Sequence, residues 1–502
     1  MRTTLLLFTI FGLGTTMVAT PQLPISPDHF VLLPVPTDPT VSFRIWFKAG
    51  SQNDPTGKEG LAEITAAMLT DAATMKNSYE AILAKLYPLA ASYNASASTE
   101  MTVIYGRTHK DNLADYYPLF LDAIVRPAFR QEDLDRIKSQ ALNYLENVLR
   151  YANDEELGKA VLYNRLFSGT PYGHITTGTI ESVRSITVDD VRSFYAKHYT
   201  RDNVVIGLGG GYDESLVKHL SADLGSLPEG TPASVPVSRA KTLKGFHVTI
   251  VEKDAPATAI SMGYPIGILR GSKEWYALAI ANSWLGEHRN SSSHLYQVIR
   301  EKRGLNYGDY SYIEHYPNGG QRQLPPQNVC RRQQIFEVWI RPVPNEARHF
   351  ALRAALREYK KLAEGGMSQG DFDLTRNFLK KYVLNYAVTT MDRLGYALDD
   401  RFYGIKGSHL DLFRSMMETI TLADVNAAIR KYWHYGDMEI AIITKDAESL
   451  RKELLGDSPS PIQYATPKPQ EVLSEDKEIA IFPVPLRRED ITVVQVKDLL
   501  VR

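Results

Sequence analysis

One short helix holds a lone carboxylate where zinc chemistry would need histidines. The segment GKEGLAEITAAMLTDAAT, residues 57–74, predicts a helix that opens after a glycine-containing turn. Two histidines four residues apart share one helix face and can bind zinc, while a neighbouring glutamate polarises water. The middle of this segment carries Glu63, Ala66 and Ala67 instead, and none of the twelve histidines of the chain lies four residues from another. The ordinary interpretation of Glu63 is a carboxylate on a helix surface.

Arg300 and Tyr307, seven residues apart in IREKRGLNYG, form a second candidate pair. A guanidinium and a phenolic hydroxyl directed at developing negative charge stabilise it, most strongly where water is excluded. Without further context, the ordinary interpretation is that both side chains only make structural hydrogen bonds at a loop. A third candidate is weaker, because the glycine-rich segment 207–215 lacks the third glycine of a dinucleotide-binding loop and predicts a strand-to-helix turn.

The elements that must position these residues occur twice. Residues 185–216 and 419–450 match without a gap at an offset of 234, as in Thr187 and Thr421. In each copy the threonine is expected to cap an amphipathic helix, which is followed by a strand and a second helix. The starts of the two halves, near residues 30 and 246, both predict strand, turn and strand. The chain is therefore expected to contain two similar α+β domains.

These patterns give provisional boundaries. The first domain is expected over residues 20–233 and the second over 246–456, joined by a linker at 234–245 that is rich in Pro, Gly and Ser. Residues 457–502 are expected to form a strand-bearing extension that packs on one domain.

The composition and the N-terminal sequence indicate which partners and which cellular compartment to expect. The 502 residues carry a formal net charge of -1, which gives no sign of a nucleic-acid partner. Residues 1–19 have the pattern of a secretory signal peptide, with Arg2 before a short apolar run, and no other stretch is apolar enough to span a membrane. Export to a bacterial periplasm, with no membrane association after cleavage, is expected. The lone cysteine, Cys330, excludes an internal disulfide and is expected to be an incidental surface thiol.

Taken together, several segments resemble the M16 (pitrilysin/insulinase-like) zinc peptidase family. They are GSQNDPTGKEGLAEITAAML, YNASASTEMTVIYG, GTPYGHITTGTIESVRSIT, SSSHLYQVIREKRGLNYGDYS and the duplicated blocks. The resemblance implies two duplicated M16-type domains, each with an antiparallel sheet packed against helices, that form half of a clamshell. Active members carry His-x-x-Glu-His on the first helix, and here those three positions are Glu63, Ala66 and Ala67. A further glutamate ligand would fall at Tyr144, with Glu146 as the alternative register.

The resemblance also assigns roles to residues outside the lost zinc motif. Arg300 and Tyr307 match the pair with which active members hold substrate carbonyls and the oxyanion. Asn94, Ala95 and Ser96 match an edge strand whose backbone binds an extended peptide, although an ordinary sheet strand remains an alternative.

Two functions from different classes follow. The first is a non-catalytic subunit that binds no zinc itself and lends Arg300 and Tyr307 to a zinc-bearing M16 partner in a heterodimer that hydrolyses peptides. The second is a peptide-binding or scaffold protein with no proteolytic role. The sequence nominates no other hydrolytic site, so the chain is expected to be inactive alone.

Overall fold

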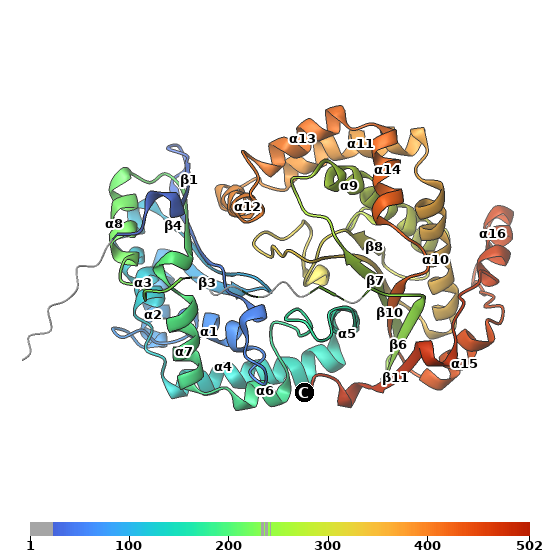
Figure 1. Cartoon of the computed structure of the whole chain (residues 1–502), viewed down its shortest axis with the longest axis horizontal. Helices are drawn as coiled ribbons and strands as arrows, with labels where there is room; N and C mark the ends of the chain where they lie inside the picture. The colour runs from blue at the N-terminus through green and yellow to red at the C-terminus, as the bar shows by residue number, and fades with distance from the viewer. Residues whose placement is uncertain (1–23, 232–234, 236–238, 241) are drawn as a thin grey trace, which may run out of the picture.

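The computed structural model describes residues 24–231, 235, 239–240 and 242–502. The expected signal peptide at 1–19 and parts of the expected linker at 234–245 lie outside the described residues. Figure 1 shows two lobes, each built from a sheet with helices packed against it. In the described part of the chain, no helix combines the length and the hydrophobicity that a bilayer span requires.

The N-terminal sheet has five strands in the order β1-β5-β2-β4-β3, which leaves β3 at one edge. The strands are β1 Phe30–Pro34, β2 Thr40–Phe47, β3 Ser92–Ala97, β4 Thr102–His109 and β5 Val204–Gly210.

The C-terminal sheet repeats this order and adds one strand. Its order is β11-β6-β10-β7-β9-β8, so β6, β10, β7, β9 and β8 occupy the places of β1, β5, β2, β4 and β3. The strands are β6 Phe246–Glu252, β7 Ala257–Ile266, β8 Asp309–Tyr312, β9 Gln334–Pro344, β10 Met438–Thr444 and β11 Ile491–Gln495.

The sheets are mainly antiparallel, as expected, but each also contains parallel pairing. β1 pairs with β5 in parallel, and β6 pairs in parallel with both β10 and β11. The reason is the connection: more than a short hairpin separates these strands, and intervening helices return the chain in the same direction. All other strand pairs are antiparallel.

The helices confirm the duplication at the predicted offset. Thr187 and Thr421 accept hydrogen bonds from the N–H groups of Asp190 and Asp424, each at 3.2 Å, and so begin α7 and α14. The helices of the first half are α1 Leu61–Thr70, α2 Tyr79–Leu86, α3 Leu113–Val125, α4 Gln131–Asn143, α5 Asp154–Leu166, α6 Ile180–Ser185, α7 Val188–His198 and α8 Glu214–Leu224. Those of the second half and tail are α9 Lys273–Gly286, α10 Arg348–Gly365, α11 Gln369–Tyr382, α12 Thr390–Tyr403, α13 His409–Thr419, α14 Leu422–Tyr432, α15 Ala447–Gly456 and α16 Gln470–Ala480.

One helix from each half packs against the sheet of the other half. Helix α5 packs on β7 and β10, and α12 packs on β1, β2 and β5 (Figure 1). Glycines permit the close approach of α12: a Cβ at Gly207 would lie 3.1 Å from Leu398 Cδ1, and one at Gly209 would lie 3.1 Å from Thr390 Cγ2. Gly207 and Gly209 of the glycine-rich segment are thus packing positions, and β5 is followed by the predicted strand-to-helix turn before α8.

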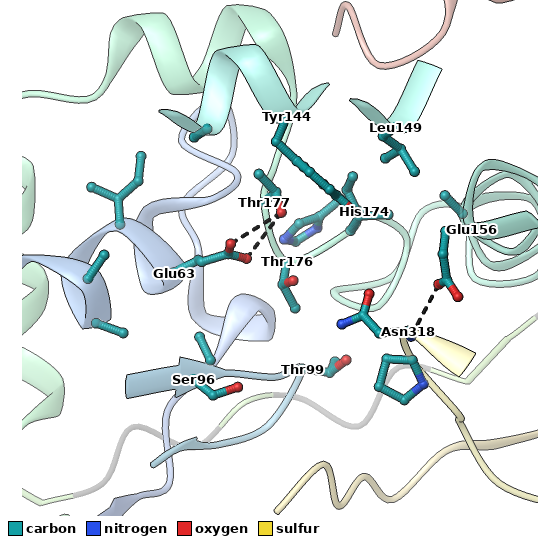
Figure 2. Close-up of a pocket in the computed structure, with 18 of the residues that line it drawn as sticks. Glu63, Ser96, Thr99, Tyr144, Leu149, Glu156, His174, Thr176, Thr177 and Asn318 are labelled. Atoms are coloured by element: carbon teal, nitrogen blue, oxygen red, sulfur yellow. Dashed lines mark hydrogen bonds between the residues drawn. The ribbon is translucent and has the colours of Figure 1, made fainter. Parts of the chain in front are cut away.

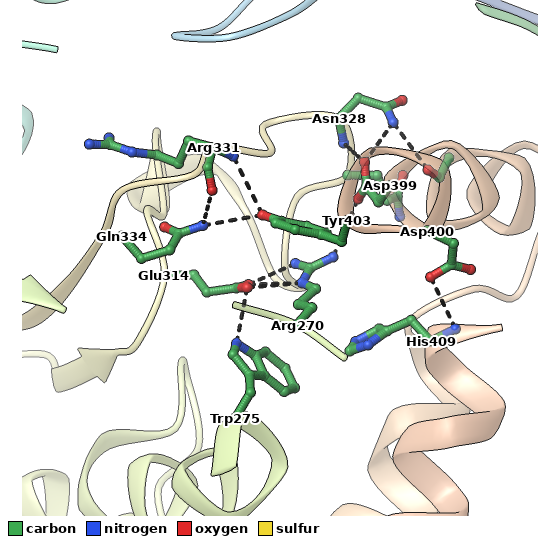
Figure 3. A network of polar contacts seen from close by, with 12 residues as sticks. Arg270, Trp275, Glu314, Asn328, Arg331, Gln334, Asp399, Asp400, Tyr403 and His409 are labelled. Atoms are coloured by element: carbon green, nitrogen blue, oxygen red, sulfur yellow. Dashed lines mark hydrogen bonds and ion pairs between the residues drawn. The ribbon is translucent and has the colours of Figure 1, made fainter. Parts of the chain in front are cut away.

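A buried polar network fixes α12 between the halves (Figure 3). Asp399 of α12 lies 3.3 Å from Arg270 Nη1, and its Oδ1 accepts the Asn328 N–H at 3.0 Å. Asn328 Oδ1 in turn accepts a hydrogen bond from Arg44 of β2 at 2.5 Å. Loops of the second half, α12 and the first sheet are therefore joined by charged and polar groups that are each buried.

Two expectations about the rest of the chain were wrong. The C-terminal extension packs on both domains, because β11 pairs with β6 while Leu500 O accepts the Ile180 N–H at 2.8 Å. Cys330 is not at the surface: it is 3% exposed, in a cluster with Trp46 and Leu398 that α12 helps to close.

Candidate functional site

Helix α1 begins where an aspartate and a glycine fix its first turn. The buried carboxylate of Asp54 accepts the N–H groups of Gly60 and Ala62, each at 2.8 Å, which satisfies donors that a helix N-terminus leaves unpaired. Gly60 has a φ of 98°, and a Cβ there would lie 2.5 Å from Thr177 O. Glycine is therefore required for the segment around Thr177 to lie against the start of α1.

Glu63, Ala66 and Ala67 face a chamber of about 610 Å³. Residues of both halves line it (Figure 2). The first half contributes residues of α1, β3, α4 and α5, of the π-helix η5 (Tyr144–Ala152) and of the loop before α6. The second half contributes residues between 315 and 331. The apolar part of the lining includes Ile64, Ala66, Ala67, Ile137, Ala141, Leu149, Ala160 and Ile175.

Glu63 is not the helix-surface carboxylate of the ordinary interpretation, because its side chain points into this chamber (Figure 2). Thr177 Oγ1 donates to the carboxylate, at 3.3 Å from Oε1 and 3.2 Å from Oε2. Burial raises the pKa of Glu63, and the hydroxyls of Thr176 and Thr177 offset only part of that rise.

The side chains around Glu63 do not fit a zinc ion. Zinc favours four ligands from His, Cys, Asp and Glu, whereas Ala66 and Ala67 present methyl groups. The imidazole of His174 lines the chamber, but its Nε2 lies 3.2 Å from Asp54 Oδ2, the carboxylate that begins α1. Within residues 24–231, 235, 239–240 and 242–502, no group of three or more His, Cys, Asp or Glu could hold a metal ion.

The two candidates for the further ligand position lie on different faces of η5. Tyr144 lines the chamber with Glu63, and burial together with the charges of Glu156 and Glu63 raises the pKa of its hydroxyl to about 12. Glu146 lies outside the chamber, where its Oε1 accepts a hydrogen bond from Arg184 Nη2 at 2.6 Å. A tyrosine thus occupies the chamber-facing position.

Strand β3 is an edge strand, as the resemblance implied, and it runs along the chamber. Ala95 and Ser96 line the chamber, whereas Asn94 does not. Among the described strands β3 pairs only with β4, so its other edge carries backbone groups without a strand partner.

The structure brings Arg300 and Tyr307 together, but outside the chamber. Both line an open groove of about 590 Å³ on the second half, together with Pro256, Ala257, Gly304, Leu305, Asn306, Pro342, Pro344 and Glu346; we call it the C-terminal groove. None of these residues lines the chamber. Arg300 lies on the π-helix η7 (Tyr296–Glu301), with Nη1 3.2 Å from Glu301 Oε1, and Tyr307 is 78% exposed.

Sequence reasoning missed the residues by which the second half closes the chamber. Lys159 of α5 is 1% exposed and donates to Tyr316 O at 3.2 Å, with its ammonium 4.0 Å from the ring centroid of Trp339. Arg331 reaches the chamber from the loop before β9. No local pattern marks either residue, because each faces the chamber only after the two halves have packed together.

Comparison with known proteins places this geometry in context. A family model described as Insulinase (Peptidase family M16) matches residues 30–180, and one described as Peptidase M16 inactive domain matches residues 185–379.

Three known proteins illustrate the similarity. The chain is 25% identical over 311 residues to an uncharacterized zinc protease of Streptomyces coelicolor, covering 61% of this chain and 66% of that relative, just under two thirds of its length. It is 23% identical over 407 residues to the non-peptidase homolog YmxG of Helicobacter pylori, covering 79% of this chain and 87% of the relative. A crystal structure of a peptidase M16 inactive domain from Pseudomonas fluorescens superimposes with a TM-score of 0.73 and 25% identity, covering 83% of this chain and 95% of that one.

Proposed function

Since the chain belongs to peptidase family M16, we propose that it serves as a non-catalytic subunit of an M16-type zinc peptidase. In this proposal a partner chain with an intact His-x-x-Glu-His motif holds the zinc, and Arg300 and Tyr307 of the present chain complete its active site. The substrate is an extended peptide.

The position of Arg300 and Tyr307 is the observation that carries this proposal. Neither residue lines the chamber that holds Glu63, Ala66 and Ala67, so the pair does not face the lost zinc motif of its own chain. Tyr307 is 78% exposed, and the Arg300 guanidinium has only Glu301, a surface neighbour, as an ion-pair partner within the described residues. A guanidinium and a hydroxyl on an open groove are free to meet a second chain and to donate to an oxyanion there.

Cofactor and compartment belong to the same proposal. The chain is proposed to bind no zinc, because Ala66 and Ala67 cannot act as ligands, and zinc is assigned to the partner alone. Residues 1–19 are proposed to direct export to the periplasm, where the heterodimer would assemble. Metal analysis of the purified chain and N-terminal sequencing of the exported protein test these two points.

Reconstitution tests the function. The chain is mixed with an M16 chain from the same organism that carries the complete zinc motif, and cleavage of a fluorogenic peptide is followed. Removal of one oxyanion donor typically costs about 10²–10³-fold in kcat, so Arg300→Ala and Tyr307→Phe should each reduce turnover strongly without dissociating the complex. Lys302→Ala, which removes a half-exposed neighbour 3.9 Å from Glu475, is the matched control and should leave turnover unchanged. Full turnover with either Arg300→Ala or Tyr307→Phe would reject the assignment.

A second candidate function is a peptide-binding or scaffold protein without any proteolytic role. The observation that favours it is the open edge of β3, which can pair with an extended peptide through backbone hydrogen bonds alone. Affinity purification from the exporting cell separates the two functions: a zinc-bearing M16 chain that co-purifies in equal amount supports the subunit, and its repeated absence supports the scaffold.

A further inference from the structure

The chamber lining includes a buried guanidinium, that of Arg331, with one nitrogen that has no hydrogen-bond partner. Arg331 is 2% exposed, and among the described residues it takes part in no ion pair. Its Nε donates to Gln333 O at 2.6 Å, while Nη2 is buried without a hydrogen-bond partner. An unpaired buried charge is costly, and proteins ordinarily place an anion beside it.

The carboxylate near Arg331 is already committed to other groups. Glu100 accepts hydrogen bonds from the backbone N–H and Nη1 of the neighbouring Arg332, both at 2.5 Å, and from the Tyr172 hydroxyl. Three carboxylates line the chamber itself, and each has a partner of its own. Glu156 lies 3.6 Å from Lys159 and accepts the N–H of Gly319, Glu63 accepts a hydrogen bond from Thr177, and Asp71 interacts with the charge of Arg136. The Arg331 guanidinium is therefore left for a group that the chain itself does not supply.

Aromatic rings hold that guanidinium in a fixed orientation. Its central carbon lies 4.8 Å from the ring centroid of Phe167 and 4.7 Å from that of Tyr172. Figure 3 shows the side chain turned away from the Arg270 network, while its backbone is tied into that network through Tyr403 and Gln334. A planar cation positioned in this way is preorganised to bind a planar carboxylate.

We propose that the chamber is a binding site for a short peptide with a free C-terminal carboxylate, which Arg331 holds while the open edge of β3 pairs with the peptide backbone. Arg331, Ala95 and Ser96 line the same chamber, so one ligand can reach both. The chamber volume, about 610 Å³, restricts the ligand to a few residues and lies within the ~300–1,000 Å³ typical of small-ligand sites. The small side chains of Ala66 and Ala67 supply room that metal ligands would have filled.

This binding needs neither zinc nor a second chain, so it stands apart from the role of Arg300 and Tyr307. The test is isothermal titration calorimetry of the whole chain, alone and metal-free, with N-acetyl-trialanine and with its C-terminal carboxamide. The acid is expected to bind, and the amide is expected to bind at least about tenfold more weakly, because it loses a charge-assisted hydrogen bond.

Variants then locate the contact. Arg331→Gln should remove the difference between acid and amide, whereas Arg331→Lys should keep part of it. The matched control is Arg130→Gln, which deletes a half-exposed guanidinium 3.3 Å from Glu132 and should bind like the unmodified chain. Equal binding of acid and amide by the unmodified chain, or no binding of the acid, overturns the proposal, and this comparison stands even if Arg331→Gln fails to fold. Turnover of the reconstituted heterodimer is a separate readout that these results do not decide.

Discussion

Replacing Asp399 with alanine should loosen the junction that holds the chamber together. Asp399 is 1% exposed, and its Oδ1 accepts both the N–H and the Nδ2–H of Asn328, at 3.0 and 2.9 Å. The alanine leaves these two buried donors unpaired at about 1–3 kcal/mol each, while Arg270 keeps Glu314 at 2.8 Å as a second partner. A total loss of about 3–5 kcal/mol is expected, in the range for a broken buried ion pair.

Hydrogen exchange at the amides of α12 measures this loss locally, which matters because a chain of two domains can unfold in more than one step. Since about 1.4 kcal/mol corresponds to a tenfold change, the slowest α12 amides should exchange about a hundredfold faster or more in Asp399→Ala. Asp399→Asn keeps an acceptor for Asn328 and should show a smaller acceleration. Asp373→Ala, which removes a 45% exposed carboxylate 3.3 Å from Arg376, should change little. Equal effects of Asp399→Ala and Asp373→Ala would refute the reasoning.

Two further predictions concern the chamber and the tail. Because burial raises the pKa of Glu63 above its ordinary value of 4.5, the unfolded chain releases this proton first as pH rises. Glu63→Gln should therefore melt at the same temperature as the unmodified chain near pH 4 and at a higher temperature at pH 7, and an equal difference at both pH values would contradict this. Deletion of residues 499–502 removes the carbonyls that accept the N–H groups of Ile180 and Glu181, at 2.8 and 2.9 Å. These two amides should exchange faster in the truncated chain, whereas Arg502→Gln, a change at an 86% exposed side chain, should leave them protected.

Local chemistry explains why much of the fold could be predicted. Thr187 and Thr421 each cap a helix by accepting the N–H of the residue three positions later. Because both partners are close in the sequence, this contact could be predicted without the tertiary structure. The offset of 234 residues likewise predicted that α7 and α14, and β5 and β10, would be equivalent. Strand direction was not predictable in this way, since the parallel pairing of β1 with β5 depends on how the intervening helices return the chain.

The sequence by itself determined that the helix after the glycine turn lacks the histidines of a zinc motif, because the side chains of Ala66 and Ala67 have no lone pairs in any fold. Only the tertiary structure decided that Tyr144 rather than Glu146 faces Glu63, that Arg300 and Tyr307 lie outside the chamber, and that Arg331 lies inside it. The physical reason is that the chamber is formed by the packing of two halves far apart in the chain. The direction in which a side chain points across such an interface depends on contacts that no local pattern encodes.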